Sequence, residues 1–502
     1  MRSLYPAASI CLVLLLDACG GGDVNGPLGS GLRIVLGAGV TDTVDAQVGP
    51  LVVEVRDQGR LAKALVRFES QTISDPPSPF RDAAVSVCRT VCPSLFTYVE
   101  DSSDANGRAT VSVRLGPRPG KWYVRITVPA LGLADSVSYT VLAGAPAGVR
   151  AVIADTALDI GEKTTVQGRV VDRYENLRSE STTLTAGPVA ALTIDPATNT
   201  VTARDMGTQW VFPRYNSFYD STRVRVLPSG RLLVWSALER VVRLVDINGR
   251  NERTILSNIW SALGANPQFD PTRRQVTLHN ASDPAGTNGN PDVITVIDTT
   301  GTSRRDLGSV LGFDEIMATR QTADGALLVV ARRASDLSHP DLNLWKIADD
   351  NSVTFLAYLP DTGPYNGGAD ISHTGTKVVF AANASTFPPE LYVMDVATGS
   401  TKLIDNGFSP RWSAQDDRIA YLTAIDGTGT GMVANADGTG RLSLGSHTFS
   451  GGFGWSPDGT YVVGHNGEAA EMHIVRVVDG AHVVVFFRNG TGFHDYSQPD
   501  WR

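Results

Sequence analysis

The sequence predicts an all-β protein in which two β-sandwiches precede a six-bladed β-propeller. Three observations support this prediction. Short runs of alternating apolar and polar residues, the pattern of half-buried strands, recur along the whole chain. Turn residues separate these runs, and the 502 residues include 50 glycines and 27 prolines. From residue 269 onward a sequence motif returns every 41 to 52 residues, which is the repeat length of a solenoid or a propeller.

Residues 1–18 have the features of a secretory signal. Arg2 precedes an apolar run, Tyr5 to Leu16, that is too short to span a bilayer as a helix. The run ends in Leu16-Asp17-Ala18-Cys19, which resembles the cleavage motif of bacterial lipoproteins. The resemblance implies a lipid-anchored envelope protein acylated on Cys19, and Gly20 after the cysteine favours the outer membrane, on its periplasmic or its surface face. A plain secretory signal with an incidental cysteine is the alternative.

The next two regions are predicted to be sandwiches on a tether. Residues 19–30 are glycine-rich and should be flexible. Residues 31–145 contain alternating runs separated by turns, which is typical of a β-sandwich, and residues 146–228 repeat the theme. The segments Asp104-Ala105-Asn106-Gly107 and Pro119-Gly120-Lys121-Trp122 resemble bacterial Ig-like repeats. This resemblance implies two Ig-like modules, which would form a stalk.

Two of the four cysteines lie close together in the first sandwich. We expect Cys88 and Cys92 to form a disulfide, because the envelope is an oxidising compartment. A metal site is not expected there, since two further ligands are missing nearby and the first histidine is His279.

The repeat of the C-terminal half is plainest at Gly454-Trp455-Ser456-Pro457-Asp458-Gly459, where turn residues follow an aromatic marker. The markers, or the residues that replace them, stand at positions 269, 321, 371, 412, 455 and 501. Each of the first five precedes runs for three further strands. The strands that the sixth lacks are supplied by residues 231–235 and 241–256, which have no marker in front. We therefore expect six four-stranded blades in residues 229–502, closed by the C-terminal strand.

This turn motif, together with Leu391-Tyr392-Val393-Met394-Asp395, resembles the TolB-type, WD-repeat-like propellers. The third blade departs from the pattern, with Ile347 near the usual Asp. In the TolB family the propeller docks a peptidoglycan-associated lipoprotein, but the family's N-terminal α/β domain has no counterpart in this sequence. The resemblance therefore implies a protein or peptide of the envelope as the partner, bound at a channel mouth. The candidate contact residues precede the markers on the inner strands and are Gly368, Ser409, Phe453 and Gln498.

Motifs of catalysis are not found, whether Gly-x-Ser-x-Gly, His-Glu-x-x-His or a Walker loop, so we expect neither an enzyme nor a cofactor. The net charge of −9 argues against a nucleic-acid partner. All eight histidines fall in the propeller, and His373 and His494 lie near inner strands. The alternative is therefore a glycan-binding or polyuronate-lyase-like propeller enzyme with a histidine-based metal site. Four tryptophans are expected in the core rather than in a sugar-stacking surface: Trp235, Trp412, Trp455 and Trp501.

Overall fold

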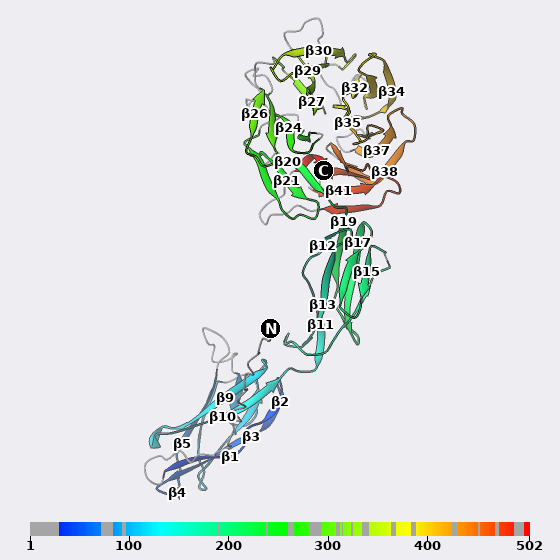
Figure 1. The fold of residues 1–502 in the computed structure, drawn as a ribbon. Coiled ribbons are helices and arrows are strands. Elements are labelled where there is room, and N and C mark those ends of the chain that lie inside the picture. The colour runs from blue at the N-terminus through cyan, green and yellow to red at the C-terminus, as the bar shows by residue number, and fades with distance from the viewer. Residues whose placement is uncertain are drawn as a thin grey trace, which may run out of the picture. The chain divides into compact units, whose positions relative to one another are not determined.

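In the computed structural model, strands make up nearly all of the regular secondary structure of the described residues (Figure 1). The structure describes residues 30–71, 84–92, 97–188, 190–236, 239–259, 266–270, 272–280, 293–307, 312–313, 315–322, 325–333, 341–362, 368–382, 388–423, 429–449, 452–466, 471–485 and 496–502. Within these residues one short 3-10 helix occurs, Pro129–Leu131 (η1), and the all-β fold class is confirmed. The expected signal and tether up to residue 29, with Cys19, and also His494, lie outside the described residues. No described helix is long and apolar enough to cross a membrane.

The first sandwich consists of two sheets that enclose one apolar core. The first sheet contains Gly31–Leu36 (β1), Gln47–Asp57 (β3), Arg60–Leu61 (β4), Val85–Cys88 (β6) and Arg108–Leu115 (β8), in the order β1-β3-β8-β6 with β4 beside β3. The second contains Thr41–Thr43 (β2), Leu65–Ser70 (β5), Tyr98–Ser102 (β7), Gly120–Val128 (β9) and Leu133–Leu142 (β10), in the order β2-β10-β9-β5-β7.

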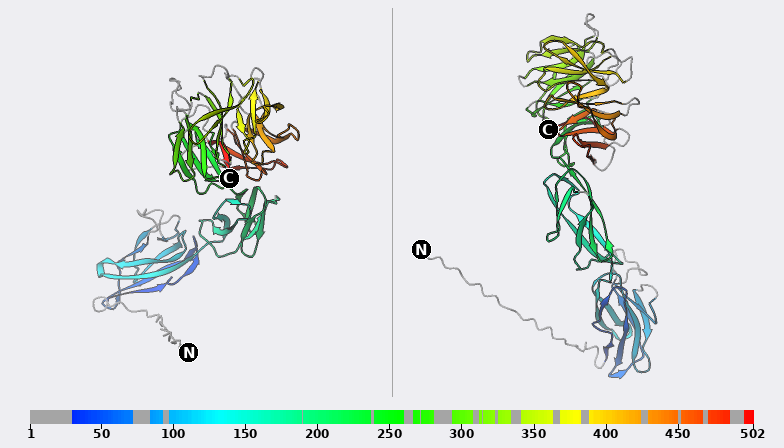
Figure 2. Two further views of the ribbon diagram at one scale, coloured as in Figure 1. Left: turned by 45° about the horizontal axis from the view of Figure 1, so that its top comes forward. Right: turned by 90° about the vertical axis from the view of Figure 1, so that its right-hand side faces the viewer.

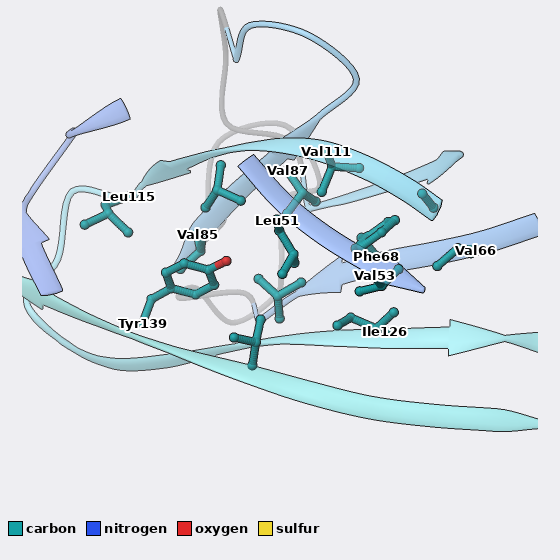
Figure 3. Packing of buried hydrophobic residues seen from close by; sticks show 14 of the residues in the cluster. Leu51, Val53, Val66, Phe68, Val85, Val87, Val111, Leu115, Ile126 and Tyr139 are labelled. Atoms are coloured by element: carbon teal, nitrogen blue, oxygen red, sulfur yellow. The ribbon is translucent and has the colours of Figure 1, made fainter. Parts of the chain in front are cut away.

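The core of this sandwich follows from the period-2 pattern of its strands. Along β8 every second side chain is buried, because successive side chains of a strand point to opposite faces. Leu51 and Val53 of the first sheet lie across from Phe68 and Ile126 of the second, and all four are inaccessible to solvent (Figure 3). At the end of β6, the buried Cys88 and Cys92 are joined by a disulfide.

The second sandwich has the same two-layer plan. One sheet contains Pro146–Ile153 (β11), Lys163–Asp172 (β13), Leu192–Asp195 (β15) and Thr200–Ala203 (β16), in the order β11-β13-β16-β15. The other contains Ala157–Asp159 (β12), Thr183–Ala186 (β14), Gly207–Tyr215 (β17), Phe218–Tyr219 (β18) and Thr222–Leu227 (β19), in the order β12-β19-β17-β14 with β18 beside β17. Leu158, Val166, Val201 and Val211 belong to its core. The Ig-like assignment of both sandwiches stays a prediction.

The remaining strands form six four-stranded sheets, which we number as blades. Blade 1 contains Arg231–Ser236 (β20), Val241–Asp246 (β21), Arg253–Ser257 (β22) and Tyr496–Trp501 (β43); blade 2 contains Gln268–Phe269 (β23), Gln275–Asn280 (β24), Val293–Asp298 (β25) and Arg304–Leu307 (β26); blade 3 contains Glu315–Gln321 (β27), Leu327–Arg332 (β28), Asn343–Ile347 (β29) and Val353–Tyr358 (β30). Blade 4 contains Ala369–Ile371 (β31), Lys377–Ala382 (β32), Glu390–Asp395 (β33) and Thr401–Asn406 (β34); blade 5 contains Phe408–Trp412 (β35), Arg418–Leu422 (β36), Gly429–Asn435 (β37) and Leu442–Phe449 (β38); blade 6 contains Phe453–Trp455 (β39), Tyr461–Asn466 (β40), Glu471–Arg476 (β41) and His482–Val485 (β42).

The ring of blades is closed by the last strand of the chain. β43 pairs antiparallel with β20, with Trp501 opposite Leu232 and Tyr496 opposite Ser236. The inner strands β43, β23, β27, β31, β35 and β39 each contact the next one around the ring, and β39 contacts β43. In both views of Figure 2 the C-terminal end of the chain lies at the propeller. The predicted six-bladed propeller, and its closure by the C-terminal strand, are thus confirmed.

Candidate functional site

The residues directly before the six markers line one cavity, of about 250 Å³, inside the ring of inner strands. They are Gln268, Arg320, Asp370, Arg411, Gly454 and Asp500. Four markers complete the wall together with Phe453, Pro457 and Pro499: Phe269, Trp412, Trp455 and Trp501. These four and Trp235 are at most 7% exposed, so the aromatic markers belong to the core, as predicted. Five of the six residues before the markers are polar or charged, and we call these five the polar ring: Gln268, Arg320, Asp370, Arg411 and Asp500.

The polar ring is organised on the Asp370 carboxylate, which is inaccessible to solvent. Its Oδ1 accepts hydrogen bonds from Arg320 Nη2 at 3.1 Å and Gln268 Nε2 at 3.3 Å. Arg411 Nη1 lies 3.6 Å from the same oxygen, and Oδ2 accepts the Trp412 backbone N–H at 2.9 Å. The donors come from blades 2, 3 and 5 and meet on blade 4. The network therefore joins blades that are not neighbours.

Arg411 is a second buried cation of this network, with a side chain that is 10% exposed. Burial lowers the pKa of its guanidinium, while the Asp370 and Asp500 carboxylates oppose that shift. Nη2 of Arg411 also donates a hydrogen bond to Oδ1 of Asn266, which lies just before blade 2. A buried guanidinium is tolerated only where such acceptors surround it, because an unpaired buried charge is costly.

Both carboxylates of the ring also bind the backbone of the following blade. Asp500 Oδ2 accepts the Phe269 N–H at 2.7 Å, just as Asp370 accepts the Trp412 N–H. In each case the donor is the marker of the next blade. Arg320 Nε makes the complementary contact, since it donates to the Ile371 carbonyl at 3.2 Å. These side chains therefore hold neighbouring inner strands together.

His373, one of the two histidines singled out in the sequence, lines the cavity. Its Nδ1 lies 3.2 Å from Asp416 Oδ1, and its Nε2 lies 3.3 Å from Arg320 Nη1. A guanidinium can only donate, so the hydrogen-bond network assigns the imidazole proton to Nδ1 and makes Nε2 an acceptor. Both ring nitrogens are therefore engaged. Among the described residues no group of three His, Cys, Asp or Glu side chains could hold a metal ion.

Asp416 fixes this histidine from the neighbouring blade. It accepts the backbone N–H of His373 at 2.6 Å and that of Thr374 at 2.8 Å, in addition to the imidazole contact. Burial raises the pKa of Asp416, but the hydrogen bonds from His373 and Thr374 outweigh it and lower the pKa to about 2. The carboxylate is thus held in its charged form.

Asp416 occupies a position of the turn after its marker at which several other blades have glycine. In blades 3, 4 and 6 the fourth residue of this turn is a glycine with positive φ, namely Gly325, Gly375 and Gly459. In blades 5 and 2 the same position holds Asp416 and Arg273, both with φ of 57°. A side chain in this left-handed region costs of order 1–3 kcal/mol, and such positions cluster at functional sites. Asp416 anchors His373, and Arg273 lines the cavity.

The sequence-based contact residues lie close to this site but only one of them lines it. Phe453 is part of the cavity wall, whereas Gly368 and Ser409 are not. Those two lie against each other, since a Cβ added to Gly368 would sit 3.5 Å from the Ser409 Cα. Gln498 is on β43, and its side chain is outside the described residues. The sequence reasoning missed the residues of the polar ring. The signal that could have identified them is the recurrence of polar residues immediately before the markers.

No family model and no curated protein matches this sequence. Solved structures similar to the chain include TolB from Acinetobacter baumannii, with 14% identity, a TM-score of 0.43, and coverage of 63% of this chain and 82% of that chain. They also include an oligogalacturonate lyase in complex with manganese (8%, 0.34, 68% and 85%) and the β-propeller domain of Cps50 (Swd1) from Myceliophteria thermophila (11%, 0.33, 52% and 88%). None of these proteins is similar enough for its activity to be transferred to this chain.

Proposed function

We propose that the protein is a non-enzymatic binding platform of the bacterial cell envelope, which holds a protein or peptide at the central cavity of its propeller. A lipid on Cys19 would anchor it, most simply in the outer membrane, and two Ig-like modules would serve as its stalk. The membrane contact is thereby assigned to the N-terminus and the partner to the propeller. Nucleic acid is not part of this proposal.

The cavity itself is the observation that supports this function. Its two innermost carboxylates accept backbone and side-chain donors, and both nitrogens of His373 are engaged. A general base must instead be able to reach a substrate proton. Phe269, Trp455 and Pro457 add apolar atoms to a wall that also contains many polar and charged side chains. A concave site in which fixed polar groups orient the ligand is the usual form of a binding site.

The alternative, a propeller enzyme with a histidine-based metal site, would need His373 or His494 as a ligand. Arg320 Nη1 occupies the acceptor position of the His373 imidazole, and a cationic group there disfavours a metal ion. His494 lies outside the described residues. The arrangement at His373 therefore favours binding over metal chemistry.

Ala414 offers the best position for a test, because it lines the cavity and is half-exposed. A photo-crosslinking amino acid at residue 414 should capture a partner in intact cells, and one at the exposed Ala397 should not. Ala414→Arg should then weaken binding of the captured partner about tenfold or more by occupying the cavity, while Ala397→Arg leaves it unchanged. Equal capture at both positions, or equal affinity of both variants, would contradict the proposal.

A further inference from the structure

We propose that the cavity recognises a carboxylate of the bound polypeptide, and that Arg273 is the residue that receives it. The inference rests on the proposed function, because it names the group of the partner that enters the site. It follows from which hydrogen-bonding groups of the cavity are already used, from the position of Arg273 in its turn, and from the size of the cavity.

The carboxylates of the cavity already accept hydrogen bonds from other groups of the protein. Asp370 accepts bonds from two side chains and from the Ile371 and Trp412 N–H groups. Asp270 accepts the N–H groups of its own turn, at Arg274 and Gln275, both at 2.7 Å. Asp500 accepts two further backbone N–H groups. A cationic ligand would therefore have to compete with the backbone for every carboxylate of the site.

The guanidinium of Arg273, in contrast to these carboxylates, is available to a ligand. It lines the cavity and is half-exposed. Across the described part of the chain, no carboxylate pairs with its guanidinium and no side-chain hydrogen bond engages it. Five N–H donors in a planar fork match a carboxylate in geometry as well as in charge. The chain carries this side chain at a left-handed turn position where three other blades have glycine, although glycine would relieve the backbone strain.

Further arginines lie near Arg273, although they do not line the cavity. Arg502 donates to the Arg273 carbonyl at 2.7 Å and covers the ring of Phe269. Burial lowers the pKa of Arg502, and the charges of Arg231, Arg253 and Arg273 lower it further, with Asp246 as the opposing carboxylate. Repulsion among these guanidinium groups would be relieved by an anion between Arg273 and Arg502.

The volume of the cavity limits what can enter. At about 250 Å³ it is smaller than the roughly 300–1,000 Å³ of typical small-molecule pockets. It therefore suits one acidic side chain, or the terminal carboxylate of a chain, better than an acidic oligosaccharide.

A peptide array tests the inference on the full-length protein. Random peptides would be presented as free acids and as C-terminal amides, and each hit resynthesised with Asn or Gln in place of Asp or Glu. We expect the loss of the relevant carboxylate to weaken binding about tenfold or more, since a charge-assisted bidentate contact disappears. The two series distinguish an acidic side chain from a chain terminus.

Variants of adjacent residues assign the effect to Arg273. Arg273→Gln should abolish the preference for acids, whereas Arg274→Gln, in the same turn but outside the cavity wall, should keep it. Arg273→Gly should also lose the preference while its thermal midpoint stays at or above that of the wild type. Peptide binding without a preference for acids, or a preference that survives in Arg273→Gln, would overturn the inference and leave the proposed function standing. Binding of oligogalacturonate but of no peptide would overturn both.

Discussion

Asp370→Asn should be among the most destabilising single substitutions in the propeller that remove no apolar group. The change keeps the shape of the side chain but removes the charge on which Arg320 and Arg411 converge. The side chains of these arginines are only 4% and 10% exposed, so water cannot take over the role of the carboxylate. Removing one partner of a buried ion pair costs about 3–5 kcal/mol, because the remaining charge is left uncompensated.

Differential scanning calorimetry of the full-length chain would measure this effect. At about 2–4 °C per kcal/mol, the propeller transition should fall by roughly 6–20 °C. The transitions of the two sandwiches should stay in place and serve as the internal reference, since a chain of several domains need not unfold in one step.

Asp306→Asn is the matched control, because Asp306 and Arg304 form a pair that is 43% and 41% exposed. Such surface pairs contribute about 0–1 kcal/mol, so this variant should shift the transition by little. Adding Arg411→Met to Asp370→Asn should recover part of the loss, since the unpaired cation is then removed as well. If Asp370→Asn lowered the transition no more than Asp306→Asn, the carboxylate would not be the centre of the network.

The remaining predictions concern closure, pH, metal content and location. Gly230→Ala should cost about 3 kcal/mol or more, because its Cβ would lie 2.2 Å from Trp501 Nε1, whereas Gly249→Ala, with no atom within 4 Å, should cost about 1 kcal/mol; similar midpoints would contradict this packing. The Asp416 pKa is lowered from 3.8 to about 2, so its contribution to stability is complete above pH 4 and is lost as the pH falls from 4 to 2; Asp416→Asn, but not Asp417→Asn, should flatten the fall of the thermal midpoint in that window. Elemental analysis of the purified protein should find no stoichiometric transition metal, and a metal that is lost in His373→Ala would establish the enzyme alternative. Cys19→Ala should abolish fatty-acid labelling and release the protein from membranes, and a wild type that takes up no label would exclude the lipoprotein proposal.

The sequence was sufficient to predict the ring but not the contents of its cavity. Recurrence of markers such as Trp412 and Trp455, together with the surplus strands before residue 257, determined both the number of blades and the closing strand, because these depend on local patterns. The cavity brings together Gln268, Asp370 and Arg411, which are far apart in the chain. Their position directly before the markers indicates that they face the cavity, but no local pattern specifies which of them bond to one another. His373 was singled out correctly as a residue near the channel, but its engagement by Arg320 and Asp416 could be seen only in three dimensions.

The pairing of the last strand, β43, with β20 has a consequence for how the propeller folds. Leu232 pairs with Trp501, which lies about 270 residues later in the chain. The entropy cost of closing so long a loop grows only slowly with its length. Pairings between such distant residues nevertheless form late and slowly during folding. Until then β20 presents an unpaired edge, which invites pairing with another chain. In a protein exported before it folds, this interval could end only after the last residues have crossed the membrane. Whether the propeller folds correctly or pairs with another chain would then depend more on how fast β43 pairs with β20 than on the final stability of the ring.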